Sequence, residues 1–288
     1  SEGNIGLQGV QLGLGGVSYW GAERFANYLY MASRNWRDNS TSETILPSSG
    51  QLNENGYPLY LDEGQVLMAR PGQNSHSPDD LLQGKISLTW EGTADIRAGL
   101  DQQISGTSNG MIEDGKREYQ ISGNVNGIPV YIHAIDPADP PTKIRLWLPH
   151  PDDPQNRTFE PAPGAKEPLF HPAYLDLINI EEFSTYRFMD WGHTNANPSV
   201  DWEDRRPGDH AFMAGVTVER ASPGLEYFDG YDLTNYSSQG VAFEKMIELC
   251  NITGRNMWIC VPHAATDDFI RKLAQLLNGD LTAQAVPD

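Results

Sequence analysis

The sequence predicts an α/β fold, namely a partial or partner-completed (β/α) barrel with an inserted antiparallel β-sandwich. Three observations lead to this prediction. In residues 186–195 an apolar strand ends in charged, aromatic and amide groups, and residues 256–263 repeat that order. Between residues 65 and 148, short alternating segments are separated by turn residues, which is typical of antiparallel sheets. Polar groups that follow parallel strands gather at one rim of a barrel.

The first βα unit of the barrel is expected in residues 1–56. Residues 5–17 are Gly-rich and apolar, and they predict a buried strand. Residues 22–36 then place Phe25, Leu29, Ala32 and Trp36 at helical spacing, so that one face of a helix would pack on that strand. Residues 37–56 are rich in Ser, Thr and Asn and indicate a loop.

The inserted β-sandwich is expected in residues 57–149. Its candidate strands are residues 65–70, 85–90, 94–100, 118–125, 130–135 and 143–148. Ile86, Leu88 and Trp90 alternate with Ser87 and Thr89, so one face of that strand is expected to be buried.

The barrel is expected to continue in residues 150–288, after a proline-rich connection. A short helix over residues 172–179 precedes the second strand, and helices over 240–254 and 265–278 enclose a third strand over 256–261. Thr266 is expected to cap the last helix, with Asp267 and Asp268 in its first turn. The long segment 192–238 has little periodicity, and such loops are usually functional or held by their own side chains.

Only three strands of barrel type are predicted, near Val10, Phe188 and Ile259. A closed (β/α) barrel has eight. Three explanations are compatible with this shortfall: another chain completes the sheet, the remainder is missing from this sequence, or the sandwich covers the open edge. The first two are favoured.

Composition excludes some classes of partner. The chain has 288 residues, of which 39% are hydrophobic and 10% aromatic, which favours an ordered core. Twenty basic and 39 acidic residues give a formal net charge of -19. This charge repels nucleic acids and anionic membrane surfaces, so neutral or cationic ligands fit better. No apolar run of about 18 residues occurs, so no membrane span is expected.

The chain is predicted to be an extracellular glycoprotein. It is poor in Lys and rich in Gly, Pro, Asn and Asp, and it has Asn-x-Ser/Thr sequons at Asn39, Asn156, Asn235 and Asn251. It begins at Ser1 without a basic and apolar leader, so a secretion signal has been removed or was never present. Cys250 and Cys260 either form a disulfide across a helix–sheet contact or remain buried thiols.

Several short motifs together resemble a secreted family. They are Gly16-Val17-Ser18-Tyr19-Trp20, Asn55-Gly56-Tyr57-Pro58, Arg187-Phe188-Met189-Asp190-Trp191 with Thr194-Asn195, Trp202 with Arg205, and residues 261–268. This family looks like the retaining, TIM-barrel glycoside hydrolases of clan A type. Its members are often labelled cellulose-binding and carry a β-sandwich after the first βα unit. The resemblance covers nearly the whole chain.

The resemblance also implies how hydrolysis would occur. Retaining hydrolysis needs two carboxyl groups about 5 Å apart, one protonated and one ionised. Relatives look as if a fourth strand with a Ser-Asn-Glu-type motif supplies the acid, and residues after Leu281 contain no Glu. The chain would therefore be an enzyme only if further sequence or another chain supplies that glutamate. Its catalytic residues are unknown.

The candidate substrate-binding residues share positions at or beyond strand ends. They are Trp20, Arg187, Asp190, Trp191, Asn195, Trp202, Arg205 and His263. Tryptophan rings stack on sugars, and the carboxylate, amide and imidazole groups bond sugar hydroxyls. Each also has an ordinary structural explanation: an ion pair for Asp190 with Arg187 or Arg205, a turn cap for Asn195, and core packing for the tryptophans and His263. Arg187 lies within an apolar strand, so an acidic partner is expected.

The predicted function is that of an extracellular carbohydrate-active protein, glycoside-hydrolase-like, that acts on or binds a β-linked polysaccharide. The alternative is a non-catalytic glycan-binding or structural cell-surface protein. No cofactor is expected in either case. A third hypothesis, calcium-stabilised adhesion, would place the metal among Asp267, Asp268 or the pair Asp152 and Asp153.

Overall fold

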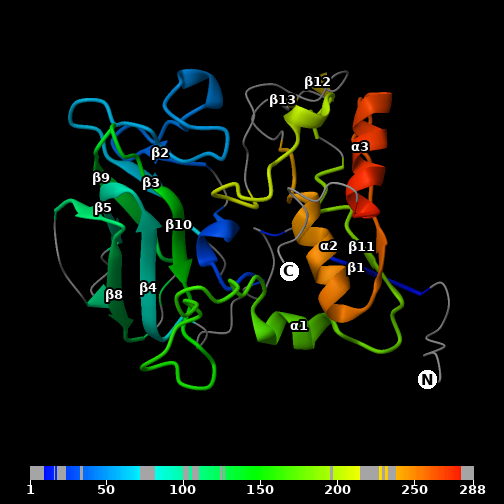
Figure 1. Cartoon of the computed structure of the whole chain (residues 1–288), viewed down its shortest axis with the longest axis horizontal. Helices are drawn as coiled ribbons and strands as arrows, with labels where there is room; N and C mark the ends of the chain where they lie inside the picture. The colour runs from blue at the N-terminus through cyan, green and yellow to red at the C-terminus, as the bar shows by residue number, and fades with distance from the viewer. Residues whose placement is uncertain are drawn as a thin grey trace. The chain divides into compact units, whose positions relative to one another are not determined.

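The computed structural model describes residues 10–15, 17, 24–32, 35–71, 82–99, 104–105, 110–123, 125, 127–194, 197–214, 227–228, 231–232 and 238–279. The chain divides into two compact units (Figure 1). Unit 1 comprises Ser1–Val17, Phe170–Gly208 and Val218–Asp288, and unit 2 comprises Ser18–Leu169 and Asp209–Thr217.

Unit 1 contains a three-stranded parallel sheet in the order β1, β11, β14. The strands are β1 (Gln11–Gly13), β11 (Thr185–Arg187) and β14 (Asn256–Trp258). The α-helices are α1 (Pro172–Ile178), α2 (Phe243–Thr253) and α3 (Asp267–Leu277), with a 3-10 turn η3 (Trp202–Asp204) and a short hairpin of β12 (Tyr227–Phe228) and β13 (Tyr231–Asp232). The predicted parallel pairing of the three strands is confirmed, as are the predicted helices at α1, α2 and α3.

One face of the parallel sheet belongs to the core of unit 1. Tyr186 and Phe188 are fully buried, and their rings meet edge to face with centroids 6.4 Å apart. The Tyr186 hydroxyl donates to the carbonyl oxygen of Ile178 at 3.1 Å, which connects the sheet to the end of α1. The sheet is therefore anchored through β11, its central strand.

The ends of α2 and α3 follow the local sequence. The Thr266 hydroxyl accepts a hydrogen bond from the amide of Phe269 at 3.3 Å, so the predicted cap of α3 is confirmed. Gly254 ends α2 in the left-handed conformation, with φ of 66°, where a residue with a side chain would be strained.

Unit 2 contains two antiparallel sheets, one of four strands in the order β10, β4, β8, β6 and one of five in the order β2, β3, β9, β5, β7. The strands are β2 (Arg37–Asp38), β3 (Leu67–Ala69), β4 (Gly84–Glu91), β5 (Thr93–Ala98), β6 (Ile104–Ser105), β7 (Ile112–Glu113), β8 (Lys116–Ile121), β9 (Val130–Ile135) and β10 (Thr142–Trp147), with 3-10 turns η1 (Tyr28–Met31) and η2 (Pro47–Ser49). The strands predicted within residues 65–148 are confirmed as strands, and Ile86, Leu88 and Trp90 are buried.

The predicted helix over residues 22–36 is wrong, because its described part forms only the short turn η1. Beyond the local bonds of this turn, the segment bonds to residues that are distant in sequence. The side-chain oxygen of Asn27 accepts from the amides of Leu29 at 3.2 Å and Leu146 at 2.9 Å, and the Ala26 carbonyl accepts from the amide of Leu148 at 3.3 Å. The apolar residues are buried as expected, but by pairing with β10 and not by helix packing.

The predicted partial or partner-completed (β/α) barrel is also wrong. The described residues form one parallel sheet of three strands, several antiparallel sheets and three α-helices, with no closed barrel. A (β/α) barrel needs about eight helices around eight strands. Most strand-forming sequence here has the alternating pattern of antiparallel pairs, and the predicted barrel rested on too few βα repeats to justify closure.

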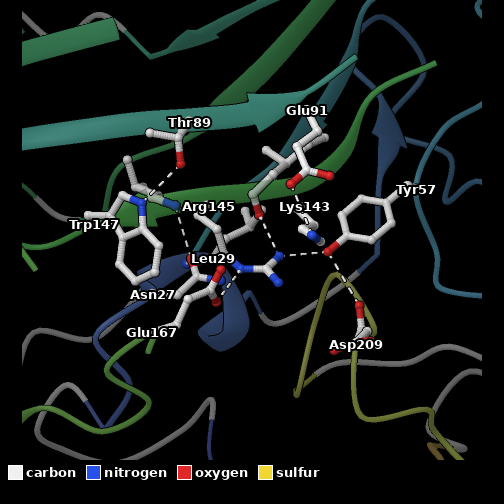
Figure 2. A network of polar contacts seen from close by, with 12 residues as sticks. Asn27, Leu29, Tyr57, Thr89, Glu91, Lys143, Arg145, Trp147, Glu167 and Asp209 are labelled. Atoms are coloured by element: carbon white, nitrogen blue, oxygen red, sulfur yellow. Dashed lines mark hydrogen bonds and ion pairs between the residues drawn. The ribbon is translucent and has the colours of Figure 1, made fainter. Parts of the chain in front are cut away.

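Arg145 lies at the centre of a buried polar network in unit 2 (Figure 2). One of its terminal nitrogens donates to the Tyr57 hydroxyl at 2.7 Å, and its Nε donates to a carboxylate oxygen of Glu167 at 3.3 Å. The Tyr57 hydroxyl donates to the backbone carbonyl of Asp209 at 3.3 Å. Burial raises the pKa of Tyr57 to about 12. The network joins β10 to three segments that are distant in sequence.

Candidate functional site

The parallel sheet of unit 1 has a second face, opposite the one in the core. Side chains alternate between the faces of a strand, and residues paired across parallel strands share a face. Register places Gly13, Arg187 and Trp258 in one row, and Gln11, Thr185 and Asn256 in the neighbouring row of the same face. We call these six residues the open face.

The open face is accessible to solvent. Gln11, Gly13, Asn256 and Trp258 are exposed, and the remaining two residues are half-buried. Trp258 is 38% exposed, which is high for a tryptophan in a strand. A Cβ atom at Gly13 would meet no atom of the described residues within 4 Å, so none of these residues fills the space beside the central strand there. The face combines an indole ring, a guanidinium, amides and a hydroxyl.

Arg187 and Trp258 form a pair on this face. The guanidinium carbon lies 5.1 Å from the centroid of the Trp258 ring, within range of a cation–π interaction. A terminal nitrogen of Arg187 donates to the sulfur of Met189 at 2.9 Å, whereas its buried Nε has no hydrogen-bond partner. The carboxylate partner predicted for Arg187 is not found among the described residues. The guanidinium of Arg187 is therefore held by the aromatic ring of Trp258 and the thioether of Met189.

Asp190 and His263 follow β11 and β14, and both are exposed. Since these strands are parallel neighbours, the two residues follow them at the same end of the sheet. After β11 the chain forms a compact turn in which the amide of Gly192 donates to the Phe188 carbonyl at 2.8 Å. A Cβ at Gly192 would lie 3.8 Å from the carbonyl oxygen of Cys260, so this turn lies against the segment that follows β14.

Three predicted site residues are buried and stabilise unit 1. Trp191 is 1% exposed, and its indole donates to the Gly15 carbonyl at 3.1 Å. The guanidinium carbon of Arg205 lies 4.3 Å from the centroid of the Trp202 ring. A terminal nitrogen of Arg205 forms an ion pair with a carboxylate oxygen of Glu244 in α2, at 3.0 Å. Their burial favours core packing for Trp191 and Trp202, and ion pairing for Arg205, over contact with a ligand. Trp20 and Asn195 lie outside the described residues.

The structure also places most of the sequon asparagines and both cysteines. Asn39, Asn156 and Asn251 are exposed, and Asn235 lies outside the described residues. Cys250 and Cys260 are free thiols, and burial raises the pKa of Cys250 to about 12.

The carboxylates considered for calcium serve local structure where their bonds are known. Asp153 accepts a hydrogen bond from the side chain of Asn156 at 2.9 Å. Asp268 pairs with Lys272 at 3.0 Å and also with Arg271. Within the described ranges, no cluster of three or more His, Cys, Asp or Glu residues is placed to hold a metal ion.

Sequence reasoning did not select Trp258. The residue was treated only as part of an apolar strand, although the order Asn256-Met257-Trp258 contains the useful signal. Alternation puts Asn256 and Trp258 on the same, polar side of the strand, and a tryptophan on that side is exposed. The missing information was the register, which pairs Trp258 with Arg187.

Comparison of the sequence with known protein families, with curated proteins and with solved structures finds no match. The resemblance to TIM-barrel glycoside hydrolases is therefore wrong: the fold contradicts it, and no family supports it. The TIM-barrel fold that the resemblance implied is likewise contradicted by the described helices and strands. In the part of the chain that the structure describes, no helix has the length and apolar character to cross a membrane.

Proposed function

We propose that this protein binds a carbohydrate chain on the open face of unit 1, and that it does so outside the cell. The supporting observation is Trp258, whose partly exposed ring lies beside Arg187 on a sheet surface that the described residues leave uncovered at Gly13. The apolar face of a sugar ring stacks on an exposed indole, while neighbouring amides and hydroxyls bond the sugar hydroxyls. Gln11, Thr185 and Asn256 provide such groups on the same face.

The proposal is for binding and not for hydrolysis. Retaining hydrolysis would need a pair of carboxyl groups about 5 Å apart. No such pair is identified in the sequence, and the fold contradicts the resemblance that implied a hydrolase. A β-linked polysaccharide is the preferred ligand, because its flat, extended chain suits the surface of a sheet. The net charge of -19 also favours a ligand other than nucleic acid.

The direct test is retention on a panel of β-linked polysaccharides, with reducing ends assayed in the same samples. We expect retention by the wild-type protein and at least tenfold weaker binding by Trp258→Ala, about 1.4 kcal/mol or more. Tyr60→Ala is the matched control, because Tyr60 of unit 2 is 37% exposed against 38% for Trp258. This control is expected to bind as the wild type does.

The proposal fails if the wild-type protein binds no member of the panel, or if Trp258→Ala binds as well as the Tyr60→Ala control. New reducing ends would show a hydrolytic activity, and would contradict the restriction to binding. Thermal unfolding of each variant shows whether it is folded, so that loss of binding is not confused with loss of structure.

A further inference from the structure

Arg187 differs from several other arginines of this protein. Arg97 and Arg117 pair with Asp95, Arg145 with Glu167, Arg205 with Glu244, and Arg271 with Asp268. Arg187 has no such carboxylate among the described residues. It contacts the Trp258 ring and the Met189 sulfur, and sulfur is a weak acceptor.

The bonding capacity of Arg187 is therefore largely unused. A guanidinium is always charged and presents five N–H donors in a planar fork. That fork matches the two oxygens of a carboxylate, which it binds with two parallel hydrogen bonds. Here Nε is buried without a partner and the side chain as a whole is half-buried. Leaving this buried donor unpaired is unfavourable. A bound carboxylate would pair with the terminal nitrogens of the guanidinium, whereas the buried Nε stays out of its reach.

Resting on the proposed function, we infer that the carbohydrate bound at the open face carries a carboxylate, as uronic acid sugars do, and that Arg187 binds this carboxylate. The guanidinium lies over one face of the Trp258 ring, 5.1 Å from its centroid, so the sugar would stack on the other face and its carboxylate would reach Arg187 past the edge of the indole. Gly13, which pairs with Arg187 on the other side, leaves room for this carboxylate. Arg187 would then bind the carboxylate while the indole of Trp258 stacks on the sugar ring.

The charge of the protein further limits which anionic ligands can bind at the open face. The other members of the open face are uncharged, so Arg187 is its single cation. The net charge of -19 repels extended polyanions, which favours a ligand with isolated carboxylates over nucleic acid or a highly sulfated chain. Screening by salt limits this repulsion to about 10 Å at about 0.1 M ionic strength, so short oligosaccharides are the suitable probes.

The test compares pairs of ligands that differ in one group. Soluble cello- and manno-oligosaccharides are each titrated beside the same oligosaccharide after oxidation of its C6 hydroxymethyl groups to carboxylates. We expect the oxidised form of at least one pair to bind the wild-type protein about tenfold more tightly, or about 1.4 kcal/mol. Arg187→Gln should lose this preference, so that the oxidised and neutral forms bind this variant with affinities within about twofold of each other.

Arg187→Lys keeps the charge without the planar fork and should retain only part of the preference. Lys143→Gln is the control for an unrelated cation, because the Lys143 side chain in unit 2 is 57% exposed, and it should behave as the wild type does. The inference is overturned if the neutral and oxidised forms bind equally, or if Arg187→Gln keeps the preference. In those cases the proposed function stands as long as Trp258→Ala loses binding. If neither form of either pair binds, both proposals fail.

Discussion

At the scale of single residues, Arg145 shows how unit 2 accommodates a buried charge. Its guanidinium bonds to Tyr57 and Glu167 and lies 5.3 Å from the centroid of the Tyr30 ring. We expect Arg145→Met to lower the free energy of unfolding by about 1–3 kcal/mol, because it removes a donor to the buried Tyr57 hydroxyl. Urea denaturation measures this change.

Lys143 on the same strand is the control for that substitution. It pairs with Glu91 at 2.9 Å, and both side chains are more than half exposed (Figure 2). Lys143→Met should change stability by less than about 0.5 kcal/mol. Equal effects of the two substitutions would show that the network around Arg145 does not stabilise unit 2.

Tyr57 makes the stability of the protein sensitive to alkaline pH. Burial raises its pKa from 10.0 to about 12, so between these values the folded state keeps a proton that the unfolded state has released. This contribution is fully present below pH 10 and is lost as pH rises through about 12. Each unit of the shift corresponds to about 1.4 kcal/mol.

Tyr57→Phe removes the ionisable group. It should be less stable than the wild type at neutral pH by about 1 kcal/mol, through the lost hydrogen bonds. The difference should shrink and then change sign as pH rises from 10 to 12, since only the wild type loses the Tyr57 contribution and the loss of about 1.4 kcal/mol per unit exceeds the initial difference. Urea denaturation at several pH values checks this, and a difference that stays constant over the range would contradict it.

At the same scale, the sequence predicts residue types at the site better than it predicts their exposure. Asp190 and His263 follow neighbouring parallel strands, as expected from the strand-end pattern. Trp191 and Trp258 both lie at or just beyond strand ends, yet one is 1% exposed and the other 38%. That difference depends on which face of the sheet the core occupies, which requires tertiary packing.

At the scale of elements, the helix signals that rest on local chemistry are reliable. Thr266 caps α3 as predicted, and Thr266→Ala should cost about 1 kcal/mol because the amide of Phe269 loses its partner. Thr266→Ser keeps the hydroxyl and should stay close to the wild type. Thermal unfolding followed by circular dichroism distinguishes the three proteins, and equal stability of the Ala and Ser variants would show that the cap does not contribute.

Helical spacing alone was misleading in residues 22–36. Phe25, Leu29 and Trp36 are buried, which the pattern predicted, but the backbone of this segment bonds to β10. The spacing of apolar residues distinguishes a helix from a strand only when one face is exposed. This segment is covered on all sides, so its apolar residues would be buried in a helix and in an extended segment alike. Asn27, whose side chain bonds the amide of Leu146, then favours the extended conformation over the helix.

At the scale of the whole molecule, the sequence predicted the strands of three or more residues and their parallel or antiparallel sense, but neither the two-residue strands nor the architecture. Three βα-like segments do form one parallel sheet in unit 1. The same local pattern occurs in open sheets and closed barrels, and closure depends on the number of strands. The net charge of -19 bears on partners and not on fold, so it could not correct this error.

The central claim is that the open face binds carbohydrate through Trp258. The most direct measurement is a carbohydrate titration followed by the indole N–H signals of the seven tryptophans in a ¹⁵N-labelled protein, with the Trp258 signal assigned by its loss in Trp258→Phe. We expect the Trp258 signal to shift with saturation, and the signals of the buried Trp36 and Trp147 to stay in place. An unchanged Trp258 signal at ligand concentrations that saturate binding would contradict the claim.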